Sequence, residues 1–305
     1  MHFKTLSAAT LLTTSLGLAL LLPAAPAVAA DCGSGPGGFS AWLGRFKQAA
    51  QAEGINQKTL DSALGGVSYS ALVIQRDRNQ HSMKLSFDEF YKRRVSNAMI
   101  QKGRNWIAAN RSLADRIEKT YGVDIEVPVA IWGMETNYGS YKGEMLPIFP
   151  SLATLAYDCR RSDFFRRNLI SALRIVQRGD MRPSDMRGAW AGEIGQTQFM
   201  AEAYYNYAVD FDGNGRRDLI NSAADVLAST ANYLKGYGWK PGGGWQPGSH
   251  NYSVLGEWNK AGVYVKAIAK MAEQMKNGKP SKTEAPSGSK KTTGGASQNG
   301  GFQFH

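Results

Sequence analysis

Glu135 is the residue of this sequence best placed to transfer a proton. It lies in residues 128–139, a segment that starts with proline and ends with glycine, as helices often do. At helical spacing Glu135 shares one face with Ile131, Met134 and Tyr138. An apolar setting removes water from a carboxyl and raises its pKa, so the group can donate a proton near neutral pH. The alternative is a glutamate at the rim of a core helix that reaches out to solvent.

A glycine-rich segment at residues 188–200 carries side chains that suit a sugar. Its glycines let the backbone approach a neighbouring group closely. Gln196 and Gln198 offer amide donors and acceptors for hydroxyl and N-acetyl groups, and Trp190 offers a flat face to a pyranose ring. The alternative is a glycine-rich turn that starts a helix over about residues 197–208.

Asp210, Asp212 and Asn214 occupy positions one, three and five of a loop that follows the EF-hand calcium pattern, with glycine at position six. Position twelve is Asn221 in place of the usual glutamate, but Asp225 lies four residues further on and offers the missing carboxylate. Such a site would hold a structural Ca²⁺ that stiffens the loop, and the chemistry itself requires no cofactor. The alternative is a hydrated turn between two helices.

The sequence lacks the motifs of other common catalytic chemistries. It contains no HExxH zinc motif, no paired CxxC, no phosphate-binding GxxxxGK and no GxSxG nucleophile motif. After residue 30 only three histidines remain, at His81, His250 and His305, and they are far apart. A histidine-based triad or a zinc site is therefore not expected.

The first 30 residues have the pattern of a secretory signal peptide. Lys4 precedes an apolar run from Leu11 to Leu22, and small residues precede Asp31. The run is too short for a permanent membrane anchor, and an aspartate before Cys32 does not fit a lipoprotein signal. We therefore expect an exported, soluble periplasmic protein with no lipid anchor and no transmembrane segment.

Cys32 and Cys159 are the only cysteines. In an oxidising compartment they are expected to form one disulfide, which would tie the N-terminus of the mature chain to the middle of the domain. A bond that closes so long a loop stabilises a fold by about 3–5 kcal/mol. The alternative is a pair of free thiols.

The formal net charge is +11, and removal of Lys4 with the signal peptide leaves 35 basic against 25 acidic residues, or +10. Several basic residues occur in pairs, such as Arg160-Arg161 and Arg166-Arg167. An exported protein is not expected to bind nucleic acid, so an anionic polymer of the cell envelope is the better partner. The alternative is that each pair lies on a solvated helix face.

The spacing of apolar residues predicts a mainly α-helical fold with few short strands. Ser86 and Glu89 form a capping box before a predicted helix. The predicted helices cover about residues 39–50, 87–99, 164–176, 197–208, 222–236 and 261–276, and the best strand candidate is residues 252–255. We expect one domain over residues 31–276. The tail at residues 277–305 is expected to be disordered, because it has too few apolar residues to offset its ordering entropy.

Taken together, these segments resemble the lytic murein transglycosylase B family of bacteria. The resemblance covers about residues 38–276 and is strongest at residues 132–139, 190–200, 207–218 with 232–233, and 258–264. It implies a lysozyme-like, mainly helical fold. It also implies cleavage of the β-1,4 bond between N-acetylmuramic acid and N-acetylglucosamine in the glycan strands of peptidoglycan.

The resemblance implies that Glu135 is the only catalytic carboxyl. It first protonates the glycosidic oxygen, and then takes the proton of the muramyl C6 hydroxyl as that hydroxyl attacks C1 of its own sugar. The product is a 1,6-anhydro sugar made without water. The implied substrate-binding residues are Gln198, Tyr233, Trp258, Asn259 and Tyr264, and the implied calcium ligands are Asp210, Asp212, Asn214 and Asp225.

This sequence departs from the expected pattern at four positions. Ala189 stands where a serine hydroxyl is expected to position Glu135, and Glu193 replaces a small residue. Trp258 stands where some relatives carry tyrosine, and the spacing to Asp225 is one residue longer than expected.

Two other functions stay open at this point. A hydrolase of the same polymer needs a second carboxylate, about 5 Å from the first for retention or about 6.5–9.5 Å for inversion, and Glu144 and Glu193 are the candidates. A catalytically inactive peptidoglycan-binding protein of the same fold would not depend on Glu135. The sequence identifies no protein partner.

Overall fold

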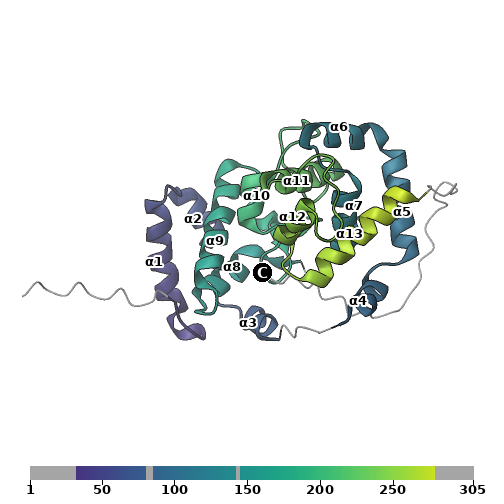
Figure 1. Ribbon diagram of the computed structural model, residues 1–305. Coiled ribbons are helices and arrows are strands. Elements are labelled where there is room, and N and C mark those ends of the chain that lie inside the picture. Colours follow the sequence, from purple (N-terminus) through teal and green to yellow (C-terminus); the bar gives the residue numbers. More distant parts are fainter. Residues whose placement is uncertain (1–31, 80–84, 142–144, 279–305) are drawn as a thin grey trace, which may run out of the picture. The chain divides into compact units, whose positions relative to one another are not determined.

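The protein is mainly α-helical, as the sequence predicts (Figure 1). The computed structural model describes residues 32–79, 85–141 and 145–278. The predicted signal peptide and nearly all of the predicted tail lie outside these ranges. The described α-helices are α1 (Phe39–Ala52), α2 (Gln57–Leu64), α3 (Ala71–Arg78), α4 (Phe87–Arg94), α5 (Asn97–Ala109), α6 (Arg111–Tyr121), α7 (Glu126–Thr136), α8 (Ile148–Tyr157), α9 (Ser162–Arg178), α10 (Ala201–Tyr207), α11 (Ala223–Gly236), α12 (His250–Trp258) and α13 (Gly262–Asn277).

Side-chain caps determine where several helices begin. Ser86 and Glu89 form the predicted capping box at the start of α4. The prediction of one helix over residues 87–99 is wrong, because Ser96 caps a separate helix, α5, by accepting the N–H of Met99. The predicted strand at residues 252–255 is also wrong. Those residues lie inside α12, where the cap at Ser249 and packing against α11 and α13 outweigh local strand propensity.

α7 is the central helix of the fold. Every residue from Val127 to Met134 is buried, so this helix is apolar on all sides. It packs against α5, α11 and α13, which surround it in Figure 1. The helix begins at Glu126 and ends at Thr136, and Asn137 closes it in the left-handed conformation. The predicted boundaries, 128 and 139, are therefore shifted by two and three residues.

A second group of helices forms around α8 and α9, which pack against each other. The amino-terminal helices α1, α2 and α3 pack against this pair, and α10 packs against α9 (Figure 1). The predicted stripe at residues 164–176 lies within α9, which ends at Gly179 with φ 84°. The apolar residues of α1 predicted to form a stripe, Phe39, Trp42, Leu43, Phe46 and Ala50, are all buried.

The described strands are short and lie next to the glycine-rich segment. β1 (Leu146–Pro147) pairs antiparallel with β2 (Arg187–Gly188). Further bridges join Gly188 to Ile194 and Ile194 to Phe199, so this segment folds back on itself twice. The helix predicted from residue 197 consequently begins only at Ala201.

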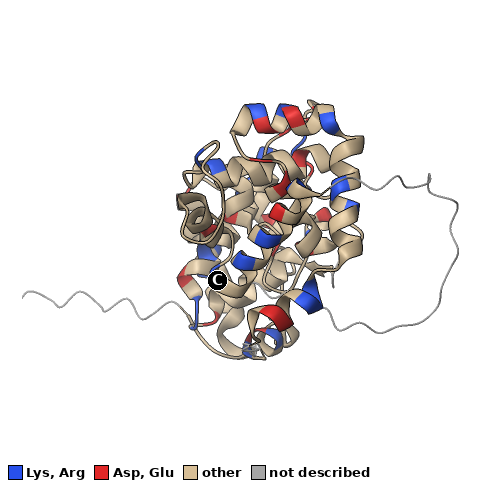
Figure 2. Ribbon diagram, turned by 45° about the vertical axis from the view of Figure 1, so that its right-hand side comes forward, with Lys and Arg blue, Asp and Glu red and all other residues tan. Residues whose placement is uncertain are grey.

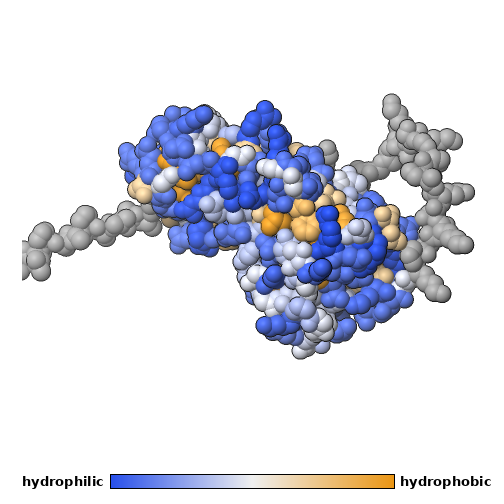
Figure 3. Space-filling view, turned by 90° about the horizontal axis from the view of Figure 1, so that it is seen from above, coloured by the Kyte–Doolittle hydropathy of each residue, from blue (hydrophilic) through white to orange (hydrophobic). Residues whose placement is uncertain are grey.

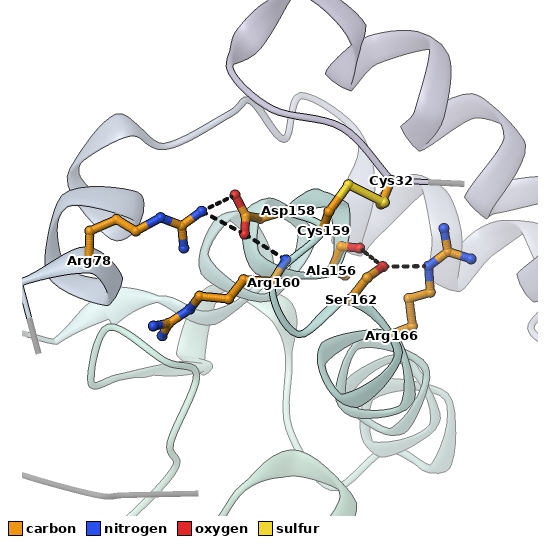
Figure 4. The surroundings of a disulfide bond; sticks show 8 residues. All are labelled: Cys32, Arg78, Ala156, Asp158, Cys159, Arg160, Ser162 and Arg166. Atoms are coloured by element: carbon orange, nitrogen blue, oxygen red, sulfur yellow. Dashed lines mark hydrogen bonds and ion pairs between the residues drawn. A yellow bond between two sulfur atoms is a disulfide. The ribbon is translucent and has the colours of Figure 1, made fainter. Parts of the chain in front are cut away.

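The predicted disulfide between Cys32 and Cys159 is confirmed, with Cα atoms 5.1 Å apart. It joins the start of the described chain to the turn between α8 and α9 (Figure 4). Arg78 of α3 makes two hydrogen bonds to the carboxylate of Asp158 in the same turn, at 2.9 and 2.7 Å. The N–H of Gly33 adds a bond to the carbonyl of Tyr157. The disulfide and these polar contacts hold three separate segments together.

Charged side chains of both signs are spread over the helices (Figure 2). The predicted basic pair Arg160-Arg161 is engaged within the protein, because both guanidinium groups contact the buried Asp77. The face in Figure 3 is mostly hydrophilic, with small hydrophobic areas. Among the described residues, no helix combines the length and the hydropathy needed to cross a bilayer.

Candidate active site

Glu135 lies in the last turn of α7, where side chains from two other helices converge on its carboxyl. The hydroxyl of Tyr264, in α13, donates to Oε1 at 2.5 Å, and the indole N–H of Trp258, at the end of α12, donates to the same atom at 3.4 Å. The residue itself is partly accessible, whereas the residues on either side in α7 are buried. The family resemblance implies that all three residues lie at one site, and the structure brings them together.

The surroundings of Glu135 act on its pKa in two directions. Burial raises the pKa of the carboxyl above its ordinary value, because the charged form loses hydration. The hydrogen bonds from Tyr264 and Trp258, and the positive charge of Arg94, lower it in part because they favour the carboxylate. The group is therefore placed to hold a proton and also to stabilise the anion left when the proton departs.

Tyr264 is itself held as a neutral donor. Its side chain is 3% exposed, and burial together with the adjacent Glu135 raises the pKa of the phenol well above its usual value. Arg94, in α4, donates to the main-chain carbonyl of Met134 at 3.0 Å, which places its charge beside the carboxyl. Nothing in the sequence marked Arg94, because its partner is a backbone atom forty residues away.

The end of α7 is joined to the glycine-rich segment through Gln196. The indole N–H of Trp132 donates to the Gln196 side-chain oxygen at 2.7 Å, and the hydroxyl of Thr136 donates to the Gln196 carbonyl at 2.6 Å. The amide nitrogen of Gln196 donates to the carbonyl of Ile220 at 2.7 Å. Gln196 is therefore a clamp that holds the glycine-rich segment against Trp132 and Thr136 of α7. Its side chain is bonded within the protein, so the structure does not support the prediction that it contacts sugar.

The predicted close approach of glycine backbone is also found, but to protein. Gly195 has φ 77°, and a Cβ there would lie 2.5 Å from the carbonyl oxygen of Leu219. A Cβ at Gly192, with φ 90°, would lie 2.4 Å from the side chain of Leu152. Glycine is required at both positions, because the backbone φ is positive and a Cβ would collide with the neighbouring atoms. Trp190 is partly buried and packs against the core.

Glu135 itself does not line the described pocket, which has a volume of about 290 Å³. Trp258 links the two, because it lines the pocket and its indole N–H donates to Glu135. Its edge packs against Phe199 and Tyr233, with ring centroids 5.2 and 5.1 Å away. The pocket is lined by Phe164, Asn168, Gln198, Phe199, Met200, Glu202, Ala203, Asn206, Tyr207, Tyr233, Tyr237, Glu257, Trp258 and Lys260. Aromatic rings combined with amides suit a carbohydrate ligand.

The remaining predicted contacts fall in or near this region. Gln198 lines the pocket, and its backbone is in the left-handed conformation with φ 57°. Tyr233 lines it too, and its hydroxyl donates to the carbonyl of Glu257 at 2.6 Å. Asn259 is 1% exposed and accepts the N–H of Ala261 through its side-chain oxygen. Its Nδ2 is buried without a hydrogen-bond partner among the described residues, and Asn259 does not line the pocket.

The predicted calcium loop brings three carboxylates together. One oxygen from each of Asp210, Asp212 and Asp225 lies within 4.8 Å of the others. Asp225 is fully buried and accepts the N–H groups of Phe211, Asp212 and Asp218. Burial raises its pKa, whereas these bonds lower it. Three carboxylates so close repel one another, and an all-oxygen set relieves that repulsion by binding a hard cation.

The other residues of this loop are tied to backbone or to each other. Asn214 accepts the N–H of Arg216 through its side-chain oxygen, so the structure leaves its predicted role as a ligand untested. Asn221, at position twelve of the pattern, directs its amide to Asp218 and not to the cluster. Of Asn221 and Asp225, only Asp225 has a carboxylate oxygen within 4.8 Å of those of Asp210 and Asp212.

Glu193, one of the two candidates for a second carboxylate, is buried with 4% exposure. Its Oε2 accepts the N–H of Ala191 at 3.1 Å. Burial raises the pKa of Glu193 to about 7, with a contribution from the nearby charge of Glu135. Glu144, the other candidate, lies outside the described residues.

Comparison with known proteins gives a family match over most of this chain. The family described as "Transglycosylase SLT domain" matches residues 38–250. The membrane-bound lytic murein transglycosylase B of Escherichia coli strain K12 is 37% identical over 129 residues, which are 42% of this chain and 35% of that protein. The match thus spans about a third of that relative's length.

Solved structures extend the similarity over most of the chain. SltB3 from Pseudomonas aeruginosa, in complex with NAG-NAM-pentapeptide, has a TM-score of 0.73 and 32% identity, and the match covers 79% of this chain and 80% of that one. The same protein with NAG-anhNAM-pentapeptide gives a TM-score of 0.72 at the same identity and coverage. Escherichia coli Slt35 in complex with calcium shares the fold, with a TM-score of 0.66, 22% identity and coverage of 77% and 92%.

The family match covers well over half of the chain and contains Glu135 and the whole glycine-rich segment. SltB3 is matched at 32% identity over four fifths of its length. This protein therefore belongs to the transglycosylase SLT domain family.

Proposed function

We propose that this protein is a lytic transglycosylase that cleaves the β-1,4 bond between N-acetylmuramic acid and N-acetylglucosamine in peptidoglycan and leaves a 1,6-anhydromuramyl end. The observation that carries the proposal is the setting of Glu135, a carboxyl with its pKa raised by burial and with two donors aimed at one of its oxygens. The SltB3 complexes support the substrate class, since their ligands are NAG-NAM-pentapeptide and its anhydro form.

The proposed reaction uses both protonation states of Glu135. The protonated carboxyl gives its proton to the glycosidic oxygen as the bond to C1 breaks. The carboxylate then accepts the proton of the C6 hydroxyl while that oxygen bonds to C1 of the same ring. Tyr264 and Trp258 stabilise the carboxylate between these two steps, because both donate to Oε1. The nucleophile belongs to the substrate, so the reaction needs no second enzyme carboxylate.

The substrate is proposed to lie along the aromatic pocket and over Glu135. Gln198, Tyr233 and Trp258 line that pocket and are placed to contact the sugar. Asn259 follows Trp258 in the chain and is proposed to support this site, because its side-chain oxygen accepts the N–H of Ala261, the N-cap residue of α13. These contacts orient the glycan and leave the proton transfer to Glu135.

A hydrolase that uses Glu193 receives less support. A general base must reach a water molecule on the face of the sugar opposite the acid. The Glu193 carboxyl is buried and accepts a hydrogen bond from its own turn. A pKa of about 7 also leaves much of it neutral near neutral pH. An inactive binding protein would not need a carboxyl whose pKa is raised by burial and lowered by hydrogen bonds, as the pKa of Glu135 is.

The chemistry of the new chain ends tests the proposed function. Purified protein is incubated with purified sacculi, and the ends of the released muropeptides are identified by mass. We expect anhydro ends, which are lighter than reducing ends by one water molecule. A digest of the same sacculi by a hydrolytic muramidase gives the reference for reducing ends. A predominance of reducing ends in the test digest would show hydrolysis and end the proposal.

We also propose that the acidic loop binds a structural Ca²⁺ through Asp210, Asp212, Asn214 and Asp225. The carboxylate cluster supports this assignment, and the related fold of Slt35 was solved in complex with calcium. An ion here would tie the loop at residues 210–218 to the first turn of α11, which carries Asp225. The cluster is separate from Glu135, so the ion is assigned to stability and not to the reaction.

Removal of calcium is expected to lower the melting temperature more than it lowers activity at room temperature. An ion present at one hundred times its dissociation constant stabilises the native state by about 2.7 kcal/mol. Calorimetry with added Ca²⁺ or with a chelator measures the shift. Asp212→Asn serves as the matched variant, because Asp212 is exposed and asparagine keeps an oxygen for the N–H of Asn214 and a polar group for the hydroxyl of Ser222. Its melting temperature is expected to respond weakly to calcium, and a wild-type melting curve unaffected by the chelator would contradict the assignment.

The periplasm is the proposed location, with residues 31–276 as the catalytic domain behind a cleaved signal peptide. The composition of residues 1–30 and the disulfide between Cys32 and Cys159 support export to an oxidising compartment. Peptidoglycan strands are the proposed partner there.

A further inference from the structure

Tyr138 has a backbone conformation that side chains of its size rarely adopt. Its φ is 61°, and it lies between Asn137 with φ 49° and Gly139 with φ 72°. A positive φ is unfavourable for a bulky residue, because its Cβ crowds the neighbouring backbone. These three residues directly follow the helix turn that carries Glu135. Strain of this kind persists only where the surrounding structure compensates for it, and it often lies at functional sites.

The side chain of Tyr138 is held between α5 and α7. It is 8% exposed, and its hydroxyl donates to the carbonyl of Met99, in α5, at 2.6 Å. Its ring packs edge to face against Trp132 of α7, with the centroids 5.4 Å apart. The ammonium group of Lys102, also in α5, lies 5.0 Å from the ring centroid and donates to the carbonyl of Asn137 at 3.0 Å. These contacts offset the unfavourable φ.

Two glycines inside helices make room for this ring. A Cβ at Gly133 of α7 would lie 2.8 Å from Cζ of Tyr138, and a Cβ at Gly103 of α5 would lie 2.7 Å from its hydroxyl oxygen. Both glycines are buried. Glycine in a helix interior is less stable than alanine, so each helix loses some stability where it admits the ring.

The turn that contains Tyr138 also binds the carbonyl groups at the end of α7. The N–H of Asn137 donates to the carbonyl of Gly133 at 2.9 Å, and the N–H of Tyr138 donates to the carbonyl of Trp132 at 3.2 Å. Glu135 lies between these donors and acceptors in the chain. Helix ends fray where the last carbonyls lack partners. The turn therefore fixes the backbone from which the Glu135 carboxyl meets its two donors.

We propose that Tyr138 is a positioning residue for the reaction. Its ring, held between α5 and α7, keeps the last turn of α7 in place and thereby keeps the Glu135 carboxyl aimed at the glycosidic oxygen. The inference rests on the proposed function, which makes Glu135 the proton donor. Tyr138 is not among the residues that line the pocket, so its role is to hold Glu135 and not to bind the glycan.

The variant Tyr138→Gly tests this role directly. Glycine adopts a positive φ without strain, so the variant removes the ring but permits the same turn. We expect kcat for cleavage of soluble peptidoglycan fragments to fall by about a hundredfold, as a displacement of a reacting group by about 1 Å produces. KM should change little, because the pocket keeps all of its residues. A raised KM with an unchanged kcat would overturn the proposal.

Gly103→Ala tests the same contact without a change at Tyr138. The added Cβ crowds the Tyr138 hydroxyl and the flexible end of Met275, so the ring must shift. We expect kcat to fall about tenfold or more. In Gly103→Ala/Tyr138→Phe the crowded oxygen is gone, and kcat should return to within about threefold of the wild type, where Tyr138→Phe alone should also lie. If the double variant recovers nothing, the loss does not act through Tyr138 and the proposal is wrong.

Phe46→Leu is the matched control for loss of packing. Phe46 is a buried aromatic residue of α1, which packs against α8 and not against α7. The control should lower the melting temperature and leave kcat at room temperature unchanged. A loss of kcat as large as that of Tyr138→Gly would mean that general destabilisation explains both variants, and Tyr138 would have no positioning role.

Amide hydrogen exchange supplies a readout that needs no activity. In Gly103→Ala the N–H of Asn137 should exchange about tenfold faster or more than in the wild type, because the end of α7 opens more often. The amides of α11 should keep their protection. Equal protection of Asn137 in the two proteins would contradict the proposal. The measurement detects no product, so its outcome is independent of whether the wild type makes anhydro ends.

Discussion

Replacement of Glu135 by glutamine is expected to abolish cleavage of peptidoglycan, with a loss of about 10³-fold or more. Glutamine cannot deliver a proton to the glycosidic oxygen, and it cannot accept the proton of the C6 hydroxyl. Its side-chain oxygen still accepts from Tyr264 and Trp258, so the local structure should persist. Release of soluble muropeptides from sacculi by the purified variant measures the effect.

The fold of this variant is expected to be intact. Glutamine nearly matches glutamate in size and shape, and a neutral amide costs less to bury than a carboxylate. The melting temperature should therefore equal or slightly exceed that of the wild type, while the matched variant Glu126→Gln, in the first turn of the same helix, should retain full activity. Substantial turnover by folded Glu135→Gln would show that another group supplies the proton, and the assignment of the acid would be wrong.

Loss of the disulfide is expected to cause the largest change in stability. The bond between Cys32 and Cys159 closes a loop with a sequence separation of 127 residues. Cross-links over such loops contribute about 3–5 kcal/mol, largely through the unfolded chain. For a domain of this size the double variant Cys32→Ser/Cys159→Ser should melt on the order of 10 °C lower. Calorimetry of the two proteins gives the difference.

Reduction of the wild type provides the control for this experiment. A reducing agent should bring its melting temperature close to that of the double variant and should leave the double variant itself unchanged. Arg78 and Asp158 remain bonded in both proteins, so the turn itself is expected to stay folded. If the double variant and the wild type have the same melting temperature, the disulfide does not contribute to stability.

Features determined by nearby residues were predictable from the sequence. The capping box at Ser86, the helix that carries Glu135 and the stripe of α1 all depend on spacing within a few residues. The disulfide was predictable because only two cysteines exist. Glu135 stood out for a related reason, since it is the carboxyl within an otherwise apolar run.

Features determined by distant contacts were not predictable in this way. Residues 252–255 have strand-like composition, but they belong to α12, which packs against α11 and α13. The sequence predicts Gln196 as a sugar ligand, but in the structure it accepts hydrogen bonds from Trp132 and Thr136. Arg94 carries no local signal, because its contact is to the backbone of Met134. In each case the deciding partner lies far along the chain.

The clamp at Gln196 has an evolutionary consequence. One glutamine satisfies the indole of Trp132, the hydroxyl of Thr136 and the carbonyl of Ile220 at once. Only the bond between Trp132 and Gln196 joins two side chains, so loss of either residue leaves a polar group of the other without its partner. Single substitutions at these two positions should therefore cost more than paired ones, and homologues should vary at them together.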